Sequence, residues 1–173
     1  PVLLSRPGIA VNAMAHSSST LVRQIIERTL DLAFVFDAPK VDELHSQEVM
    51  TVPLALVASQ PCKNWQEATE LGYVLVDWGT SFQIQHAQEF KGMVSPGLKT
   101  NTGRIAMDAI LSHGGSAYLP EPMIAQYVES GELYVIAGAP ELNRVVYATC
   151  HSSRSDDPLL ADIIQGLMET AEP

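Results

Sequence analysis

Basic residues are scarce in this chain of 173 residues. Ten Lys and Arg stand against twenty Asp and Glu, which gives a formal net charge of -10. This sign is wrong for a surface that lies along nucleic-acid phosphates. We therefore expect that the chain by itself does not bind nucleic acid.

Long apolar runs are also missing. No stretch approaches the roughly 20 apolar residues that a membrane-spanning helix needs, and the short run at residues 1–4 is followed at once by Ser5, Arg6 and Pro7. Apolar residues still make up 46% of the chain and no low-complexity tract occurs, which favours a folded protein over a disordered one. We expect a soluble, cytoplasmic protein without a membrane partner.

Cysteine is rare, and its spacing excludes two classes of site. Cys62 and Cys150 lie far apart without a CxxC pattern, so neither a zinc site nor a disulfide framework is indicated. Reduced structural thiols are the favoured interpretation. A regulatory disulfide stays open, because it requires α-carbons within about 7 Å, which sequence cannot establish.

Catalytic motifs are absent as well. The chain contains no G-x-S-x-G elbow, no P-loop and no G-x-G-x-x-G after a strand. His86 and Glu89 form the only helical pair with metal-ligand spacing; a third ligand is missing, so a solvated helix face explains the pair better. "HGGSAY", residues 113–118, is better interpreted as a helix end at Gly114 than as an oxyanion loop. We expect no enzyme, no metal and no cofactor.

Apolar periodicity predicts alternating strands and helices. The run at 30–36 is typical of a strand buried on both faces in a parallel sheet, and Pro53 marks an edge, a bulge or a crossover in the next strand. Ser18 or Ser19 is the predicted cap of the first helix, and Asp156 or Asp157 that of the last. The predicted strands are 8–16, 30–36, 49–59, 73–78, 97–101, 115–119, 132–137 and 143–150; the helices are 20–28, 81–90, 103–112, 121–129 and one from residue 158 onward.

Two α/β blocks, joined by one long strand out and one strand back, predict two lobes with a double crossover. We expect the first lobe at 1–56 plus 151–173 and the second at 57–150. Ligand clefts are common at such switch points.

Three segments carry a resemblance to a known family. Residues 100–136, "TNTGRIAMDAILSHGGSAYLPEPMIAQYVESGELYVI", resemble the second lobe of the effector-binding domain of LysR-type transcriptional regulators, with a helix, Gly-Gly, a strand ending in Leu-Pro, a helix and Gly-Glu-Leu. "ERTLDLAFVF", residues 27–36, resembles the family's Gly-x-Leu-Asp-Leu-Ala pattern, with Thr29 where Gly is usual. "LALVAS", residues 54–59, is similar to its crossover strand.

The resemblance implies a fold and a function. The fold is α/β, with two Rossmann-like lobes joined by two crossover strands, like the type 2 periplasmic-binding proteins. The function is effector sensing in a homodimer or homotetramer that contacts promoter DNA through a winged helix-turn-helix. That domain, and the family's first strand and helix of the first lobe, have no counterpart in this chain. A periplasmic-type solute-binding protein of the same fold is the alternative.

Helix N-termini that follow strand ends present backbone N–H groups suited to small anions. We expect a small-molecule effector, such as a carboxylate, at three of them. Helix capping by the hydroxyl groups and core packing of Trp78 and Tyr118 are the alternatives left open. The predicted effector-binding residues are Ser17, Ser18, Ser19, Trp78, Gly79, Thr80, Ser81, Phe82, Thr100, Asn101, Thr102 and Tyr118.

Overall fold

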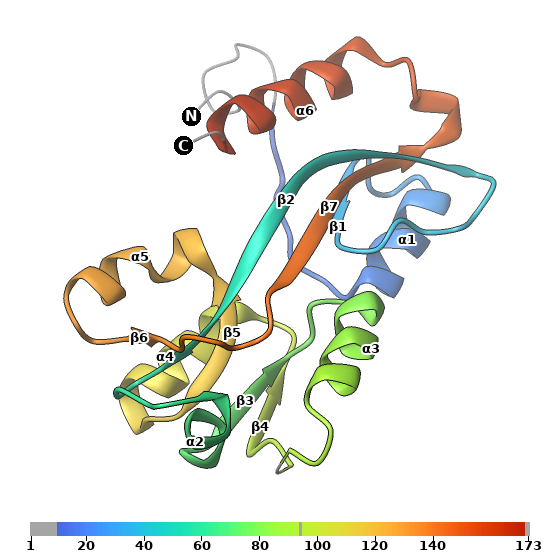
Figure 1. Ribbon diagram of the computed structural model, residues 1–173. Helices are drawn as coiled ribbons and strands as arrows, with labels where there is room; N and C mark the ends of the chain where they lie inside the picture. Colours follow the sequence, from blue (N-terminus) through green and yellow to red (C-terminus); the bar gives the residue numbers. More distant parts are fainter. Residues whose placement is uncertain (1–9, 94, 172–173) are drawn as a thin grey trace. The chain divides into compact units, whose positions relative to one another are not determined.

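The computed structural model describes residues 10–93 and 95–171 (Figure 1). The chain divides into two compact units, unit 1 with residues 1–51 and 145–173 and unit 2 with residues 52–144. Each unit combines strands with helices. The predicted lobes, 1–56 with 151–173 and 57–150, stay a prediction.

Unit 1 is a small sheet between helices. Its strands are β1 (Ala33–Val35) and parts of β2 (Leu44–Ala58) and β7 (Leu142–His151), in the order β1-β7-β2. Helix α1 (Ser18–Ile26) packs on β1 through Ile25, while α6 (Pro158–Ala171) packs on β2 and β7 through Ile164. The 3-10 turn Ser152–Arg154 joins β7 to α6.

Two predictions for unit 1 are wrong. A strand was predicted at 8–16; residues 8 and 9 lie outside the described residues, and residues 10–16 form no strand and pair with no strand in the described part of the chain. The run at 30–36 forms only the three-residue strand β1, which pairs antiparallel with β7, so the predicted parallel unit is not formed. Ala33 and Val35 are buried, but Phe34 between them is 38% exposed, because successive side chains of a strand point to opposite faces of the sheet.

In unit 1, a side-chain hydroxyl group caps one helix and a side-chain carboxylate caps another. The cap of α1 is Ser17, one residue before the predicted Ser18 or Ser19, and its Oγ accepts a hydrogen bond of 3.4 Å from the N–H of Thr20. Asp157 caps α6 as predicted, because its Oδ1 accepts from the N–H of Leu159 at 2.9 Å. An Asp side chain satisfies an N–H group that the helix leaves unpaired.

Unit 2 is an open, mixed sheet covered by helices. Strand β3 lies between β4 and β5 and is parallel to both, while β2 is antiparallel to β5 and to β6. Helix α2 was not predicted, and β6 is shorter than the predicted strand at 132–137. The elements are α2 (Trp65–Glu70), β3 (Tyr73–Val76), α3 (Thr80–Glu89), β4 (Leu98–Thr100), α4 (Gly103–His113), β5 (Ser116–Pro120), α5 (Glu121–Glu129) and β6 (Tyr134–Val135).

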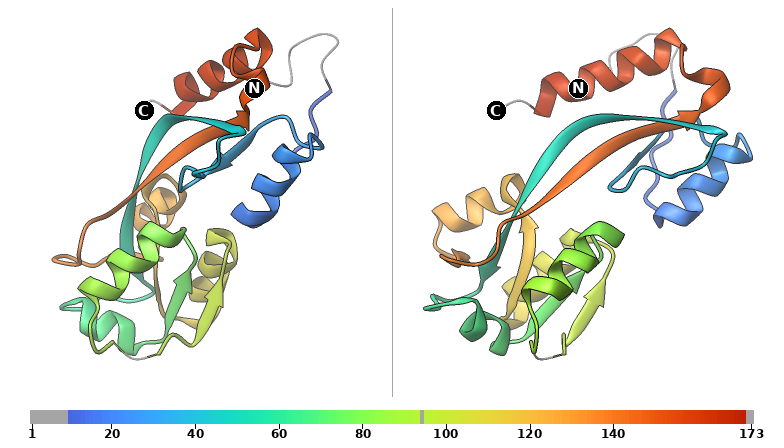
Figure 2. Two further views of the ribbon diagram at one scale, coloured as in Figure 1. Left: turned by 90° about the vertical axis from the view of Figure 1, so that its right-hand side faces the viewer. Right: turned by 45° about the vertical axis from the view of Figure 1, so that its right-hand side comes forward.

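Helices α3 and α4 cover opposite faces of the unit 2 sheet (Figure 2). Phe82 and Phe90 of the α3 segment meet Tyr118 of β5 edge to face, and Trp65 of α2 meets Phe90 at a centroid distance of 4.8 Å. Helix α4 packs on β3, β4 and β5. Aromatic contacts of this kind add to the stabilisation from burial.

Strands β2 and β7 each run through both units. The division between units falls between Thr51 and Val52, next to Pro53, and between Arg144 and Val145. Of the edge, bulge or crossover predicted at Pro53, this position beside the division favours the crossover. Within the described residues, no helix combines the length and apolar character needed to cross a membrane.

Candidate functional site in unit 2

A tight turn follows β3 and starts α3. Gly79 caps the helix with φ 96°, a left-handed conformation that favours glycine. The Oδ1 atom of Asp77 accepts from the N–H of Gly79 at 3.0 Å and from Nε2 of Gln83 at 2.8 Å. Asp77 therefore fixes the turn, whereas Thr80 and Ser81 are exposed residues of the first helical turn.

The segment after β4 lies beside this turn. The N–H of Asp77 donates to the carbonyl of Thr100 at 2.7 Å, which continues the pairing of β3 and β4 beyond the strand ends. Thr100 Oγ1 in turn accepts from the N–H of Thr102 at 3.1 Å. Two of the three predicted segments, residues 78–82 and 100–102, are therefore neighbours within unit 2.

The aromatic members of the predicted site are buried. Trp78, Phe82 and Tyr118 are 6%, 1% and 1% exposed, so little of their surface is left for a ligand. Trp78 donates through Nε1 to the carbonyl of Tyr118 at 3.0 Å, a polar contact that a buried indole needs. Core packing, the alternative left open for Trp78 and Tyr118, describes these two side chains and also Phe82.

Gly103 places α4 against Trp78. A β-carbon on Gly103 would lie 2.7 Å from the Cη2 atom of Trp78, closer than carbon atoms pack. The glycine thereby lets the helix that follows residues 100–102 approach the indole. The sequence predicted that a helix starts at Gly103, but it did not predict the contact between Gly103 and Trp78.

A polar pocket of about 660 Å³ opens between the C-terminal part of the β3–β4 pair and α3. It includes two predicted residues, Thr100 and Asn101. Its volume lies within the usual range for small-molecule sites. The polar pocket is lined by Leu75, Asp77, Gln83, His86, Ala87, Lys99, Thr100 and Asn101.

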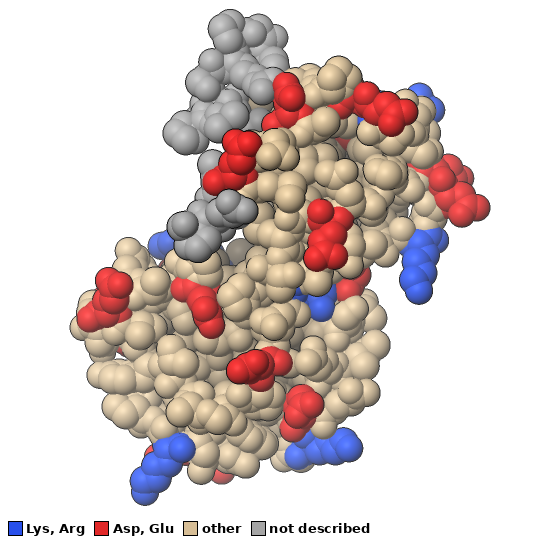
Figure 3. Space-filling view, turned by 45° about the horizontal axis from the view of Figure 1, so that its top comes forward, with Lys and Arg blue, Asp and Glu red and all other residues tan. Residues whose placement is uncertain are grey.

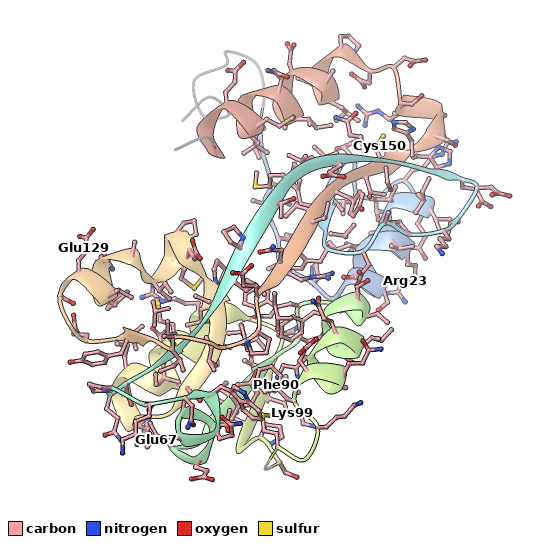
Figure 4. The ribbon with its side chains drawn as sticks, in the orientation of Figure 1. Arg23, Glu67, Phe90, Lys99, Glu129 and Cys150 are labelled. Carbon is pink, nitrogen blue, oxygen red and sulfur yellow. The ribbon has the colours of Figure 1, made fainter. Side chains whose placement is uncertain are left out.

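His86 is a buried wall of this pocket. The imidazole is 7% exposed and stacks on Phe90 with ring centroids 4.6 Å apart (Figure 4 labels Phe90 at the end of α3). The prediction of a solvated helix face for His86 is therefore wrong. The face of α3 that carries Phe82, His86 and Phe90 turns toward the sheet, and this aromatic spacing was the available signal.

The tautomer of His86 follows from its hydrogen bond to Tyr73. The Tyr73 hydroxyl lies 2.8 Å from Nε2, and burial raises the pKa of this phenol, which keeps its proton. His86 Nε2 is its only hydrogen-bond partner in the described part of the chain, and an unmade bond for a buried donor costs about 1–3 kcal/mol. Tyr73 therefore donates to Nε2.

The other imidazole nitrogen is left as a donor. Burial lowers the pKa of His86 below its usual value of 6.5, so the ring is neutral at pH 7. With Nε2 accepting from Tyr73, the proton of the neutral ring resides on Nδ1. No hydrogen bond among residues 10–93 and 95–171 engages Nδ1. His86 thus adds one N–H donor to a pocket whose other polar residues are exposed, apart from the half-buried Thr100.

The third predicted segment belongs to unit 1. Ser17, Ser18 and Ser19 start α1, where Ser17 Oγ is 3.1 Å from Ser19 Oγ and 3.0 Å from Thr20 Oγ1. Capping, the alternative left open, describes Ser17. A contact of these serines with an effector stays a prediction.

A second depression of about 380 Å³ lies in unit 1 and is mostly apolar. Leu32, Leu160 and Ile163 are among its walls, and Arg154, which pairs with Asp31 and with Asp157, is part of its lining. None of the predicted effector-binding residues lines it.

The remaining chemical candidates are thiols, metal ligands and the Gly-Gly loop. Cys62 is half-buried in unit 2 and Cys150 is buried in unit 1, both as free thiols, and burial raises the pKa of each. In the described ranges no three His, Cys, Asp or Glu side chains gather as a metal site. Gly114, with φ 80°, ends α4 as predicted.

Four polar residues of the pocket were not predicted: Asp77, Gln83, His86 and Lys99. Asp77 directly follows a buried strand, a position where ligand-binding groups gather, so a signal was available. Lys99 has no comparable signal, because its relation to α3 arises only when β4 pairs with β3.

Comparison with known proteins identifies the family. The family model described as LysR substrate binding domain matches residues 3–172. The HTH-type transcriptional regulator HdfR of Salmonella schwarzengrund (strain CVM19633) is 29% identical over 158 residues, which cover 91% of this chain and 55% of that protein. The chain thus spans about half the length of the curated relatives it matches.

Solved structures show the same fold. The regulatory domain of HypT from Salmonella typhimurium matches with a TM-score of 0.79 at 15% identity, covering 98% of this chain and 87% of that one. Full-length LysG from Corynebacterium glutamicum, solved with bound effector Arg, matches at 0.69 and 14%, covering 96% and 60%. The comparisons confirm the predicted α/β fold and give no support to a periplasmic-type solute-binding protein. The chain belongs to the LysR substrate-binding domain family.

Proposed function

We propose that this chain is the effector-sensing part of a LysR-type transcriptional regulator. Membership of the LysR substrate-binding domain family supports this function, as does the likeness to HdfR, which is named an HTH-type transcriptional regulator. Promoter DNA is contacted through a separate DNA-binding domain of the whole protein. Action in the cytoplasm, assembly as a homodimer or homotetramer, and the absence of catalysis belong to the same proposal.

One observation in unit 2 carries the proposal for the ligand. The hydrogen bond from the Asp77 N–H to the Thr100 carbonyl holds together two strand ends, each followed by a helix N-terminus. Polar side chains at such ends, next to a pocket of about 660 Å³, suit a small molecule with an anionic group. Asn101 and the hydroxyls of Thr100 and Thr102 are the proposed contacts.

Effector binding regulates by shifting a conformational equilibrium. A ligand moves such an equilibrium only by the difference between its affinities for the two conformations. The effector therefore binds one conformation of the protein more tightly, and that conformation changes how the DNA-binding domains are presented.

A thermal-shift screen tests whether an effector exists. Small carboxylates, aromatic acids and amino acids are added one by one to the purified protein. A ligand at about a hundredfold over its dissociation constant stabilises by about 2.7 kcal/mol, which raises the melting temperature by a few degrees. A melting temperature that no compound raises contradicts effector sensing by this chain.

Thr102→Trp tests the location of the site. Thr102 is exposed at the start of α4, so the large side chain fits without unfolding the chain but blocks the polar strand ends. We expect the ligand-induced rise in melting temperature to disappear. Ile105→Trp, on an exposed position of the same helix, is the matched control and should keep the response. An unchanged response in Thr102→Trp removes this segment from the site.

A further inference from the structure

The polar pocket contains one cationic and one anionic side chain. Lys99 comes from β4 (labelled in Figure 4), and Asp77 follows β3. A ligand with only negative charge meets repulsion from Asp77, and a ligand with only positive charge meets repulsion from Lys99. A ligand that carries both charges complements the pair.

Asp77 is held in place and keeps one oxygen for a ligand. Its Oδ1 atom takes the N–H of Gly79 and the side-chain amide of Gln83, at 3.0 and 2.8 Å. Among residues 10–93 and 95–171, no hydrogen bond engages Oδ2. A carboxylate fixed in this way offers an ammonium group an acceptor that needs no rearrangement.

His86 supplies a donor for the opposite end of a ligand. It is more than nine-tenths buried, it lines the pocket, and its Nδ1–H has no hydrogen-bond partner among the described residues. An N–H group in the wall of a pocket can donate to an acceptor of the ligand, and a charged acceptor makes the stronger hydrogen bond. Together with the Lys99 ammonium it suits a carboxylate.

We propose that the polar pocket binds a zwitterionic α-amino acid, with the ligand carboxylate on Lys99 and His86 Nδ1–H and the ligand ammonium on Asp77. The apolar walls formed by Leu75 and Ala87 receive the ligand side chain. This inference rests on the proposed function and names the chemical class of the effector.

Calorimetric titration with the standard L-amino acids tests the class. Each amino acid that binds is compared with its carboxamide, which lacks the carboxylate, and with its N-acetyl derivative, which lacks the ammonium. We expect both derivatives to bind at least about tenfold more weakly, since each loses a charge-assisted hydrogen bond.

Two exposed positions test the location. Asp77→Asn keeps the oxygen that Gly79 and Gln83 need but removes the negative charge, and Lys99→Gln removes the positive charge. Each should weaken the binding of the amino acid at least about tenfold. Lys91→Gln, an exposed lysine outside the pocket lining, is the matched control and should bind as the unaltered protein does.

The outcomes separate this inference from the proposed function. If no amino acid binds but plain carboxylates do, effector sensing stands and the zwitterion inference falls. If an amino acid binds and neither Asp77→Asn nor Lys99→Gln weakens it, the assignment to this pocket is overturned. If neither class of compound binds, the proposed function and this inference fail together.

Discussion

At the residue scale, His86 shows how burial changes the chemistry of a side chain. In the sequence it stands in a polar stretch, yet in the structure Phe82, Phe90 and Tyr73 surround it. Burial disfavours the charged imidazolium, and the Tyr73 hydroxyl fixes the tautomer. One neutral histidine thus becomes a directional donor rather than a charge.

The buried His86 makes stability depend on pH. Its pKa in the folded protein lies below the usual value of 6.5, so the unfolded chain takes up a proton first as the pH falls. Between the two pKa values the unfolded state binds more protons, and the free energy of unfolding rises with pH. We expect stability to fall from about pH 7 to about pH 5, by at most about 1.4 kcal/mol per pH unit for this group.

Urea unfolding across this range, with His86→Phe as the comparison, measures the effect. Phenylalanine keeps an aromatic ring in the cluster but binds no proton, so the pH slope of the variant should be smaller. The other titrating groups contribute equally to the pH slope of the unaltered protein and of His86→Phe. If the free energy of unfolding has the same pH slope in both proteins, folding does not lower the pKa of His86.

At the element scale, the start of helix α4 packs closely against the turn after β3. Gly103 lies against the Trp78 ring, whose Nε1 reaches the Tyr118 carbonyl on β5. Helix propensity alone favours alanine over glycine by up to about 1 kcal/mol. The approach of 2.7 Å opposes this gain, because the indole is buried and cannot move away freely.

Gly103→Ala is therefore expected to destabilise the protein by about 1–3 kcal/mol, the usual range for overpacking. Chemical unfolding followed by circular dichroism measures the change. Gly97→Ala is the matched control, since nothing lies within 4 Å of a β-carbon added there. Gly103→Ala with stability equal to or above that of the control would contradict the packing argument.

At the scale of the whole molecule, the net charge decides how the chain interacts with other charged molecules. With a net charge of -10 the chain repels phosphates, and Asp and Glu side chains are spread over the face seen in Figure 3. Solubility and long-range repulsion follow from this excess, but the fold does not.

We expect the purified chain to cause no mobility shift of duplex DNA at physiological salt. Non-specific binding to DNA arises from neutralised phosphates, and an acidic chain has few cations to supply. Gel mobility assays over a range of chain concentrations, with and without an effector, check this. A clear shift at physiological salt would overturn the charge argument.

Element order in unit 2 could be predicted because local patterns there agree with the tertiary fold. Helix α5 has the predicted bounds 121–129, where Pro122 lies in the first turn and Gly131 follows the end. In unit 1 the local apolar pattern did not predict the strand pairing correctly. The apolar run at 30–36 is typical of a central strand, but strand pairing is non-local, and in the described part of the chain β1 pairs with β7 alone.

The sequence by itself determined the acidic charge, the α/β order and the segments after β3 and β4, because these depend on composition and on contacts between near neighbours. Only the tertiary structure decided that His86 is buried, that Gly103 meets Trp78, and that Lys99 shares a pocket with Asp77. These relations join residues from different elements. They exist only after strand register and helix packing bring distant parts of the chain together.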